Sequence, residues 1–327
     1  MNRLMSFRRM LLTAFGIWLS LPSHLAMADT LFVSDYGSNS IYEFTAGGNR
    51  STFASGLSGP SGLAFDGGSN LFEADYWSGN IYKFTPSGSR STFASGLNGP
   101  RGLAFDQSGN LFEADIDSGH IYKFAPDGSR STFASGLNDP NGLAFDGSGS
   151  LFESDFGSGN IYKFTPGGSR STFASGLSDL EGLACDSSGN LFEGDWGSGN
   201  IHEFTPSGDQ SIFADFGMPT GLAFDSSGNL FVTTFGSYIY EFTPSGSRSI
   251  FTNGAGEGHD LAFAPTATPE PSTLTLLVIG TIGLVAYGWR KRATGRTGRS
   301  DAQDDGPAIL AFPSHESHCA EATRRAA

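Results

Sequence analysis

Short runs of alternating apolar and polar residues cover residues 31–264. In the stretch that begins at Leu71, four such runs are rich in β-branched and aromatic residues: 71–76, 80–85, 90–94 and 102–105. Gly, Ser, Asn, Asp and Pro separate the runs, as in Trp77-Ser78-Gly79. Because a period of two bounded by turn residues is typical of strands, the pattern predicts short β-strands joined by tight turns. Helical periodicity is confined to two apolar runs near the ends of the chain.

The same pattern returns about every 40 residues. Its units start at six leucines: Leu31, Leu71, Leu111, Leu151, Leu191 and Leu230. The second and third units are identical at 31 of 40 positions, and the fifth is one residue shorter. Four antiparallel strands repeated with this period are typical of a β-propeller blade, and a β-solenoid is the alternative architecture for such repeats.

The phase of the repeat decides between these two architectures. The segment Gly-Leu-Ala-Phe-Asp, which predicts the first strand of a blade, occurs in five units, with Cys185 in place of Phe in one of them, and its sixth copy is Asp260-Leu-Ala-Phe263. The repeat region therefore starts on a second strand and ends on a first strand. Pairing of these two strands completes six blades without an open edge, whereas a solenoid needs capping units that the sequence lacks. We predict an all-β fold, a six-bladed propeller of four-stranded blades over residues 29–264, closed by the C-terminal strand.

The repeated motif, seen in residues 102–115 and 79–84, resembles NHL repeats and the related propellers of gluconolactonase-like and streptogramin-lyase-like proteins. The resemblance covers residues 31–264. It implies a propeller without implying one activity, because the motif specifies the blade and a fold hosts many functions. Gluconolactonase-like enzymes hold one metal with unlike residues from different blades, and no matching set can be located in the sequence.

Charge and cysteine content exclude two classes of protein. The formal net charge is −14, and residues 29–268 contain 27 acidic against 9 basic residues. So acidic a body does not bind nucleic acid, because phosphate contacts need clustered Lys and Arg. The two cysteines, Cys185 and Cys319, do not make a disulfide framework.

The N-terminal 28 residues have the features of a secretory signal peptide. Basic residues (Arg3, Arg8 and Arg9) precede an apolar run of residues 10–21, which is short for a membrane span. Ala26 and Ala28 supply the small side chains of a cleavage site, which we place after Ala28.

The C-terminal end predicts a membrane anchor. A Pro-rich stalk at 265–271 precedes an uncharged apolar stretch at 272–289, long enough for a transmembrane helix, and a basic tail follows at 290–327. The basic cluster 290–292 predicts a cytoplasmic tail, with the acidic body outside. The sequence Pro269-Glu270-Pro271, followed by the apolar stretch and the basic cluster, resembles the PEP-CTERM sorting signal of exported bacterial proteins. The resemblance implies an exosortase partner that cuts near Pro269–Pro271, so that the body is anchored or released at the cell surface or into an extracellular matrix.

Glutamate and lysine residues are expected to face each other across the second and third strands. A three-residue loop at 77–79 would place Glu73 opposite Lys83, and the same pairing recurs as Glu113/Lys123 and Glu153/Lys163. The fifth unit instead has Glu193 and Glu203. We interpret the pairs as a ladder of ion pairs, while two carboxylates with a raised pKa at Glu193 and Glu203 are the functional alternative.

An aspartate ends the second strand of five units: Asp35, Asp75, Asp115, Asp155 and Asp195. A ring of carboxylates could hold Ca²⁺, but a side chain that accepts hydrogen bonds from its own turn explains the recurrence better. We therefore expect no metal and no cofactor. The histidines His120, His202 and His259 are single substitutions and are interpreted as drift. Near-identical blades give near-identical environments, which argues against acid–base catalysis.

Differences between the units gather in two loops, one after the second strand and one before the first strand. In an up-and-down blade these loops lie at the same end, so we predict a variable face that binds a protein or polysaccharide ligand. The candidate contacts on this face are Tyr36, Tyr76, Trp77, Arg101, Asp117, Asn141, Glu181 and Trp196. The predicted function is an exported binding or scaffold module, and the alternative is a metal-dependent lactonase or lyase of the gluconolactonase-like class.

Overall fold

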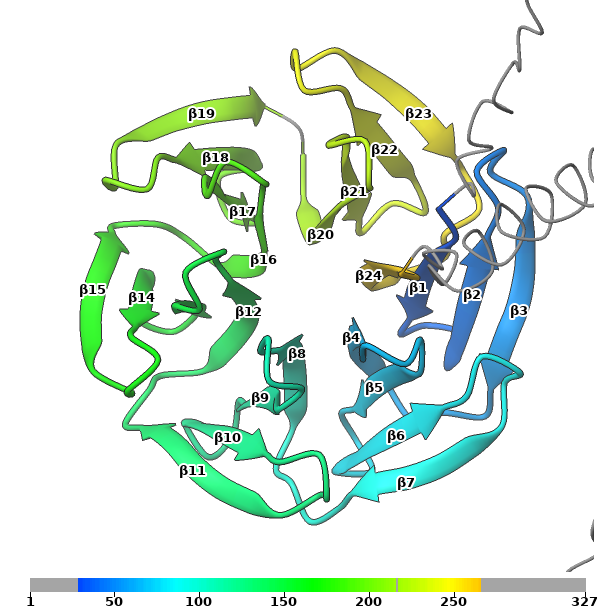
Figure 1. Ribbon diagram of the computed structural model, residues 1–327. Coiled ribbons are helices and arrows are strands. Elements are labelled where there is room, and N and C mark those ends of the chain that lie inside the picture. Colours follow the sequence, from blue (N-terminus) through cyan, green and yellow to red (C-terminus); the bar gives the residue numbers. More distant parts are fainter. Residues whose placement is uncertain (1–28, 216, 266–327) are drawn as a thin grey trace, which may run out of the picture. The chain divides into compact units, whose positions relative to one another are not determined.

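The computed structural model describes residues 29–215 and 217–265, which fold as six four-stranded antiparallel sheets around a central axis (Figure 1). Each sheet is one blade, and its strands follow one another outward from the axis. The innermost strands are β4, β8, β12, β16, β20 and β24, and the outermost strands present mostly exposed side chains. The prediction of a six-bladed propeller is confirmed for this part of the chain.

Every blade has the same order of strands from the axis outward. Blade 1 is β24 (Gly258–Phe263), β1 (Leu31–Asp35), β2 (Ser40–Phe44) and β3 (Arg50–Ser55). Blade 2 is β4 (Pro60–Phe65), β5 (Leu71–Asp75), β6 (Asn80–Phe84) and β7 (Arg90–Ala94). Blade 3 is β8 (Pro100–Phe105), β9 (Leu111–Asp115), β10 (His120–Phe124) and β11 (Arg130–Ser135). Blade 4 is β12 (Pro140–Phe145), β13 (Leu151–Asp155), β14 (Asn160–Phe164) and β15 (Arg170–Ser175). Blade 5 is β16 (Leu180–Cys185), β17 (Leu191–Asp195), β18 (Asn200–Phe204) and β19 (Gln210–Asp215). Blade 6 is β20 (Pro219–Phe224), β21 (Leu230–Thr234), β22 (Ile239–Phe242) and β23 (Arg248–Thr252).

The two ends of the repeat region close the ring. Strand β24 pairs antiparallel with β1, with Leu31 opposite Phe263 and Val33 opposite Leu261. A further backbone hydrogen bond joins Ala264 N to Thr30 O at 2.9 Å. The last strand of the region therefore completes the first blade, as the phase of the repeat predicts, and this pairing covers the edge that an open array would expose.

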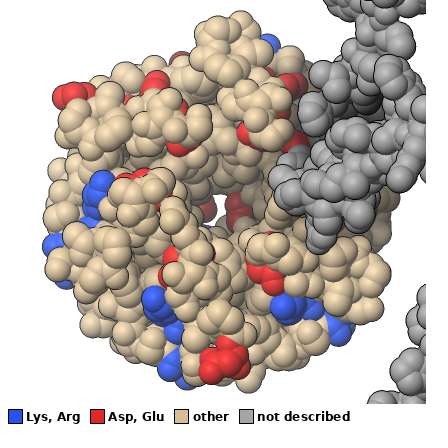
Figure 2. All heavy atoms as spheres, viewed as in Figure 1, with Lys and Arg blue, Asp and Glu red and all other residues tan. Residues whose placement is uncertain are grey.

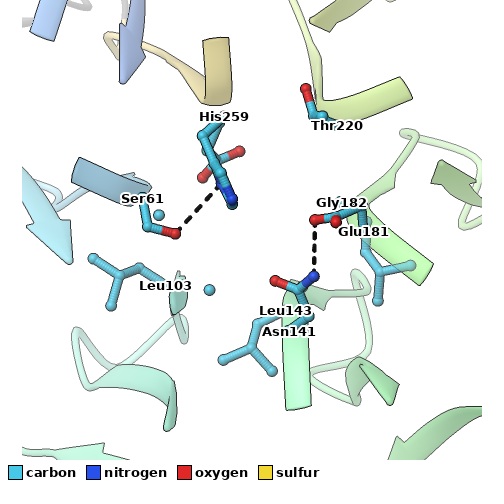
Figure 3. Close-up of a pocket in the computed structure, with 13 residues that line it drawn as sticks. Ser61, Leu103, Asn141, Leu143, Glu181, Gly182, Thr220 and His259 are labelled. Carbon is cyan, nitrogen blue, oxygen red and sulfur yellow. Dashed lines mark hydrogen bonds between the residues drawn. The ribbon is translucent and has the colours of Figure 1, made fainter. Parts of the chain in front are cut away.

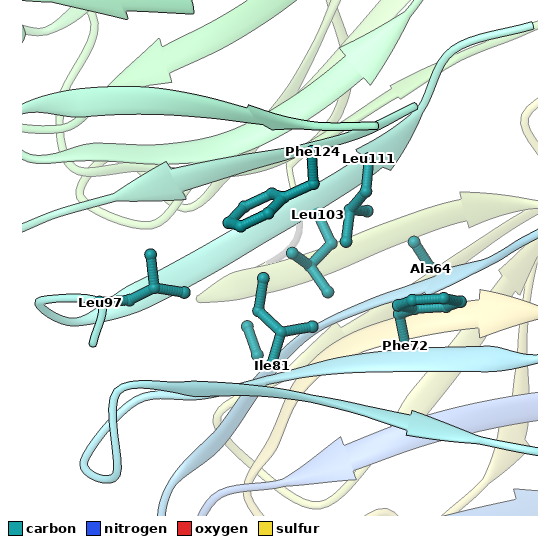
Figure 4. Packing of buried hydrophobic residues seen from close by; sticks show 8 residues of the cluster. Ala64, Phe72, Ile81, Leu97, Leu103, Leu111 and Phe124 are labelled. Atoms are coloured by element: carbon teal, nitrogen blue, oxygen red, sulfur yellow. The ribbon is translucent and has the colours of Figure 1, made fainter. Parts of the chain in front are cut away.

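Aromatic side chains fill the interfaces between blades. Phe72 of blade 2 packs edge-on against Phe93 and Phe105, with ring centroids 5.0 Å apart in both pairs. Ile81 of blade 2 and Leu111 of blade 3 are buried in the same cluster (Figure 4). Because each unit supplies the same residues, this packing recurs around the ring and binds each blade to its neighbour.

The hairpin between the second and third strands is one residue longer than predicted. Asp75 pairs with Asn80, so the loop is 76–79, and Gly79 N donates to Asp75 O at 3.1 Å. Gly79 has a φ of 64°, a conformation that glycine adopts without strain. The longer loop shifts the register by one residue, so that Glu73 faces Tyr82 and Lys83 faces Phe72.

The predicted ladder of Glu–Lys ion pairs is therefore wrong. A shift of one residue moves a side chain to the opposite face of the sheet. Each lysine instead pairs with an aspartate of the preceding turn, such as Lys83 Nζ with Asp66 Oδ2 at 3.3 Å. The equivalent pairs in blades 3 and 4 are Lys123 with Asp106 and Lys163 with Asp146.

The glutamates that lose their expected partners are buried between the blades. Both carboxyl oxygens are buried without a hydrogen-bond partner in four glutamates: Glu73, Glu113, Glu153 and Glu193. Desolvation by burial, followed by the charge of the nearby Asp75, raises the pKa of Glu73 well above its usual range. Blades 1 and 6 have Val33 and Val232 at the same position, both fully buried. This position is thus a core position that in four blades carries a carboxyl group.

The predictions for the chain ends concern residues outside the described part of the chain. They are the signal peptide at 1–28, nearly all of the Pro-rich stalk at 265–271, the transmembrane helix at 272–289 and the basic tail at 290–327. Within residues 29–215 and 217–265, no helix is long and apolar enough to cross a membrane.

Candidate binding site at the propeller axis

One position of the innermost strand carries a different polar residue in each blade. We call these six residues the axial ring: Ser61, Arg101, Asn141, Glu181, Thr220 and His259. In each blade the strand pairing slips by one residue at this point, as between Pro60 and Leu63 or between Gly258 and Asp260. Such a bulge re-aims a side chain. Five of the ring residues converge on the axis in Figure 3. The sixth, Arg101, joins them through its contacts with Asn141 and Glu181.

A glycine follows the ring residue in five blades and lets the innermost strands approach closely. A Cβ on Gly102 would collide with the carbonyl oxygen of Asn141 in the next blade. Blade 1 has Asp260 at this position, and its Oδ2 accepts a hydrogen bond from Leu63 N at 2.8 Å. Of the six positions that follow the ring residues, only that of blade 1 carries a carboxyl group.

Three ring residues form a connected polar network. Asn141 Nδ2 donates to Glu181 Oε2 at 2.9 Å, and Arg101 Nη1 lies 3.8 Å from the same oxygen. Arg101 Nη1 also donates to Asn141 Oδ1 at 3.4 Å. Burial raises the pKa of Glu181, and the Arg101 guanidinium and the Asn141 hydrogen bond oppose this effect. Arg101 Nε is buried without a hydrogen-bond partner.

The other side of the ring is neutral. Ser61 Oγ lies 3.4 Å from His259 Nδ1, and Thr220 Oγ1 donates to Gly258 O at 2.9 Å. Surrounding protein, together with the Arg101 charge, lowers the pKa of His259 to about 3, so the imidazole is uncharged at neutral pH. Burial raises the pKa of Asp260 to about 6. A neutral imidazole and a carboxyl group with a pKa of about 6 thus lie close together at the axis.

Aromatic side chains and the ring enclose a cavity of about 300 Å³. Its aromatic lining comes from the loops after the second strands: Tyr36, Phe156, Trp196 and Phe235. Its polar lining includes Arg101, Glu181, Thr220 and His259, and Glu257 also contributes. A narrower space of about 40 Å³ continues among the ring residues and the glycines and leucines that follow them. In the space-filling view the axis is open and acidic atoms border the opening (Figure 2).

The structure brings together most of the eight candidate contacts. Four of them line the cavity: Tyr36, Arg101, Glu181 and Trp196. Asn141 belongs to the ring, and the Tyr76 ring lies 5.5 Å from the Arg101 guanidinium. Trp77 and Asp117 do not line the cavity, and the Trp77 side chain is 67% exposed. Trp77 is held at the outer side by Tyr76, whose ring it meets edge-on at 4.6 Å.

Sequence reasoning missed several residues of the cavity. His259 was expected to be a neutral substitution, yet it occupies a ring position. Phe156 and Phe235 were in the variable loops without being singled out, and Asp260 was visible as the departure of the sixth unit from Gly-Leu-Ala-Phe-Asp. The signal was available in each case, because each of these residues stands at a position that varies among the units.

The axis is a place where the blades offer unlike chemical environments. Near-identical blades give near-identical environments at most positions, but at the axis six different groups meet. The likeness of the blades therefore does not argue against acid–base chemistry at this position.

The aspartates that end the second strands serve their own turns. Asp75 Oδ1 accepts from Ser78 N at 3.2 Å and Oδ2 accepts from Ser58 N at 2.7 Å. The same two-sided bonding recurs at Asp35, Asp115, Asp155 and Asp195. Because these carboxylates bind backbone N–H groups on both sides, the hydrogen bonds agree with the turn interpretation of this set.

The functional alternative for Glu193 and Glu203 fails for a geometric reason. Glu193 faces His202, while Glu203 faces Phe192, so the two carboxylates lie on opposite faces of the sheet. Burial raises the pKa of Glu193 well above its usual range, and the charges of Asp195 and Glu181 add to the effect. Glu193 therefore has Asp195 and His202 as its neighbours, and not Glu203.

Comparison with known proteins adds information on the C-terminal sorting signal and on the fold of the body. Residues 267–292 match the PEP-CTERM protein-sorting motif. The motif marks an exported protein that is sorted through its C-terminus and is recognised by an exosortase. No curated protein matches the chain.

Solved structures share the fold of the body. A chain of a nidogen/laminin complex is 20% identical with a TM-score of 0.67, and the match covers 74% of this chain and 100% of that one. Virginiamycin B lyase from Staphylococcus aureus is 14% identical with a TM-score of 0.58, and covers 74% and 92%. A gluconolactonase from Xanthomonas campestris is 23% identical with a TM-score of 0.59, and covers 63% and 79%. At these identities the likeness is one of fold.

Proposed function

We propose that this exported propeller is a carbohydrate-binding module whose axial cavity holds a neutral sugar residue of an extracellular polysaccharide. One observation carries the proposal: the six equivalent ring positions of near-identical blades hold six different polar residues at the base of an aromatic cavity. The proposal agrees with the sorting motif, which places the protein among exported chains.

The cavity has the composition of a sugar site. Aromatic rings such as Trp196 and Tyr36 offer apolar faces to the C–H face of a sugar, and the ring residues offer donors and acceptors to its hydroxyls. Its volume of about 300 Å³ suits one or two sugar rings. An anionic sugar is disfavoured because two carboxylates, Glu181 and Glu257, face one guanidinium.

A divalent metal does not fit the ring well. The single ring carboxylate, Glu181, already binds Asn141 and Arg101, and a guanidinium beside it repels a cation. Metal-dependent chemistry of the gluconolactonase kind would need oxygen ligands that are not already paired with a cation. The ring therefore favours binding over the metal-dependent lactonase or lyase alternative.

The remaining parts of the proposal concern location. Following the sequence, we propose that the body lies outside the cytoplasmic membrane, held by a C-terminal helix at 272–289 until an exosortase cuts near Pro269–Pro271. A binding module released or anchored at the cell surface would then retain polysaccharide there, and a protein ligand on the same face is the other possibility.

A binding assay tests the sugar proposal. The full chain in detergent is titrated with neutral mono- to tetrasaccharides by calorimetry, beside the Arg101→Ala variant. Loss of a charged donor in a buried polar network costs about 2 kcal/mol, so we expect affinity to fall about 30-fold. Arg130→Ala is the matched control, because Arg130 lies on an outermost strand. Equal loss in both variants, or binding unaffected by Arg101→Ala, contradicts the proposal.

A second candidate function is lactone or lyase chemistry. It is favoured by the neutral His259 and the Asp260 carboxyl near each other at the axis, and by the gluconolactonase and lyase among the structural neighbours. Turnover of a panel of sugar lactones that His259→Ala abolishes, with folding intact, would replace the binding proposal by this one.

A further inference from the structure

Blade 5 departs from every other blade at two linked positions, 202 and 210, and it shares the glutamate at position 203 with blades 1 and 6. Blades 2, 3 and 4 have Tyr, Lys and Arg where blade 5 has His202, Glu203 and Gln210. In blades 2 to 4 the Arg guanidinium lies about 5 Å above the Tyr ring, as for Arg90 above Tyr82 at 5.0 Å. In blade 5 this stack is replaced by a hydrogen-bonded pair, with Gln210 Nε2 3.1 Å from His202 Nδ1.

The substitution places an imidazole against two carboxylates. His202 faces Glu193 across the strand pair, and His202 Nε2 lies 3.7 Å from Asp195 Oδ2. One ligand atom from each of Glu193, Asp195 and His202 can be chosen so that all three lie within 4.8 Å of one another. All three side chains are buried, and Glu193 is fully so.

Two independent observations point to a missing positive partner. Both oxygens of Glu193 are buried without a hydrogen bond. In blades 2 to 4 the tyrosine that faces the equivalent glutamate carries the guanidinium of Arg90, Arg130 or Arg170, whereas blade 5 has the neutral Gln210 in that place. Blade 5 therefore keeps the buried carboxyl group and loses the cation that the other blades hold near it.

We propose that Glu193, Asp195 and His202 form a binding site for a divalent first-row transition ion such as Zn²⁺. One imidazole nitrogen and two carboxylates match the ligands that Zn²⁺ takes, while Ca²⁺ and Mg²⁺ prefer oxygen alone. The two negative charges balance the ion. The site is distinct from the axial cavity, since none of the three residues lines it.

Local geometry supports this assignment. Zinc holds N and O ligands at about 2.0–2.2 Å, which spaces them about 3.4 Å apart in a tetrahedral site. The Nε2–Oδ2 distance of 3.7 Å is close to this spacing. Gln210 contacts the other imidazole nitrogen at 3.1 Å. With zinc on Nε2 that nitrogen carries the proton and donates, so the Gln210 amide would turn to present Oε1 and orient the ring, as outer partners of metal-bound histidines do.

The ion would cross-link two strands of blade 5 on the side that packs against blade 4. Leu191, on the same face of β17 as Glu193, packs against Phe152 and Ile161 of blade 4. A metal held by β17 and β18 at this interface would add to the packing between blades 4 and 5, so we infer a structural role for the site.

The experiment compares the zinc content of variants in which a residue of blade 5 is replaced by the residue at the equivalent position of another blade. The full chain is refolded with Zn²⁺, dialysed and analysed by inductively coupled plasma mass spectrometry. His202→Tyr restores the residue of blades 2 to 4, and Glu193→Val restores that of blades 1 and 6, so both variants are expected to fold. Because His315, His318 and Cys319 are present in all samples, the difference between samples is read, not the absolute content.

The proposal predicts one more equivalent of zinc in the parent chain than in either variant. It also predicts that Co²⁺ gives the parent chain a visible ligand-field band that is reduced in both variants. Equal zinc content in the parent and in folded variants overturns the proposal, whether that content is zero or not. A loss in His202→Tyr that is not matched in Glu193→Val also overturns the three-ligand site.

Discussion

A buried carboxyl group between two blades should make stability depend on pH in a way that one substitution can remove. Glu153 is fully buried, and neither of its oxygens has a hydrogen-bond partner. Valine occupies the same position in blades 1 and 6, so the site accommodates an apolar residue of about the same volume. The perturbation is therefore Glu153→Val, which gives blade 4 the residue that blades 1 and 6 have at the equivalent position.

The sign of the pH effect follows from the direction of the pKa shift. Burial, with the charge of Asp155, raises the pKa of Glu153 well above the value of 4.5 for a free glutamate. Between the unfolded and the folded pKa the folded chain binds more protons than the unfolded chain, so stability falls as the pH rises through this window. Below the unfolded pKa the penalty is absent.

The magnitude follows from proton linkage. Each pH unit within the window costs about 1.4 kcal/mol per carboxyl group. Between pH 5 and pH 7, Glu153 thus destabilises the fold by up to about 2.7 kcal/mol, and Glu153→Val should remove this loss. A neutral buried carboxyl without a partner costs about 1–3 kcal/mol at any pH, and imperfect packing of valine offsets part of the gain.

Urea unfolding of the full chain in detergent, followed by circular dichroism at pH 5 and pH 7, measures the effect. Glu153→Val is expected to raise the midpoint at both values and more at pH 7. The reciprocal variant Val232→Glu puts a carboxyl group into blade 6 and should lower the midpoint, again more at pH 7. A gain from Glu153→Val that is the same at both pH values would refute the reasoning, because packing alone does not depend on pH.

Three further outcomes are expected. Trp196→Ala should weaken binding of a neutral oligosaccharide about tenfold in calorimetry, since loss of an aromatic contact costs about 1–1.5 kcal/mol. Trp77→Ala, outside the cavity, should leave the affinity unchanged; a larger loss in Trp77→Ala than in Trp196→Ala would place the site on the outer rim. Gly102→Ala should lower the thermal midpoint by the equivalent of about 1–3 kcal/mol because its Cβ meets the Asn141 carbonyl, while Gly67→Ala, with open space around it, should not; equal effects would contradict the close approach of the inner strands. Leu261→Asp, which puts a charge into the β24–β1 closure, should cost about 3 kcal/mol or more in urea unfolding, and a stable variant would show that closure is dispensable.

The fold could be predicted because its determinants are repeated and local. The spacing of the Gly-Leu-Ala-Phe-Asp segment and the phase between Leu31 and Phe263 determine the number of blades and their closure, and both are visible in the sequence. The register of the second hairpin could not be obtained in the same way. It depends on whether Tyr76 belongs to the strand or to the loop, and the hydrogen bonds of Asp75 and the φ of Gly79 decide this in favour of the loop.

The candidate site was predictable only in part, for a related reason. The variable positions were visible, so the face was found along with Arg101, Asn141 and Glu181. The convergence of one residue from each blade on the axis could not be predicted. A bulge in the innermost strand directs these side chains to the axis, and bulges leave little trace in the pattern of apolar and polar residues. His259 could be recognised only after its equivalence to Ser61 was known.

Variation among near-identical units can also arise by drift. Drift does not, however, favour substitutions whose side chains contact one another. The ring residues are polar in all six blades, and Arg101, Asn141 and Glu181, which come from three different blades, bind one another. The blade 5 changes show the same property, because His202 and Gln210 differ from the other blades together and contact each other. Substitutions that depend on one another across strands and blades are better explained by a shared task than by independent loss of constraint, and this is the physical reason to look for ligands at these two places first.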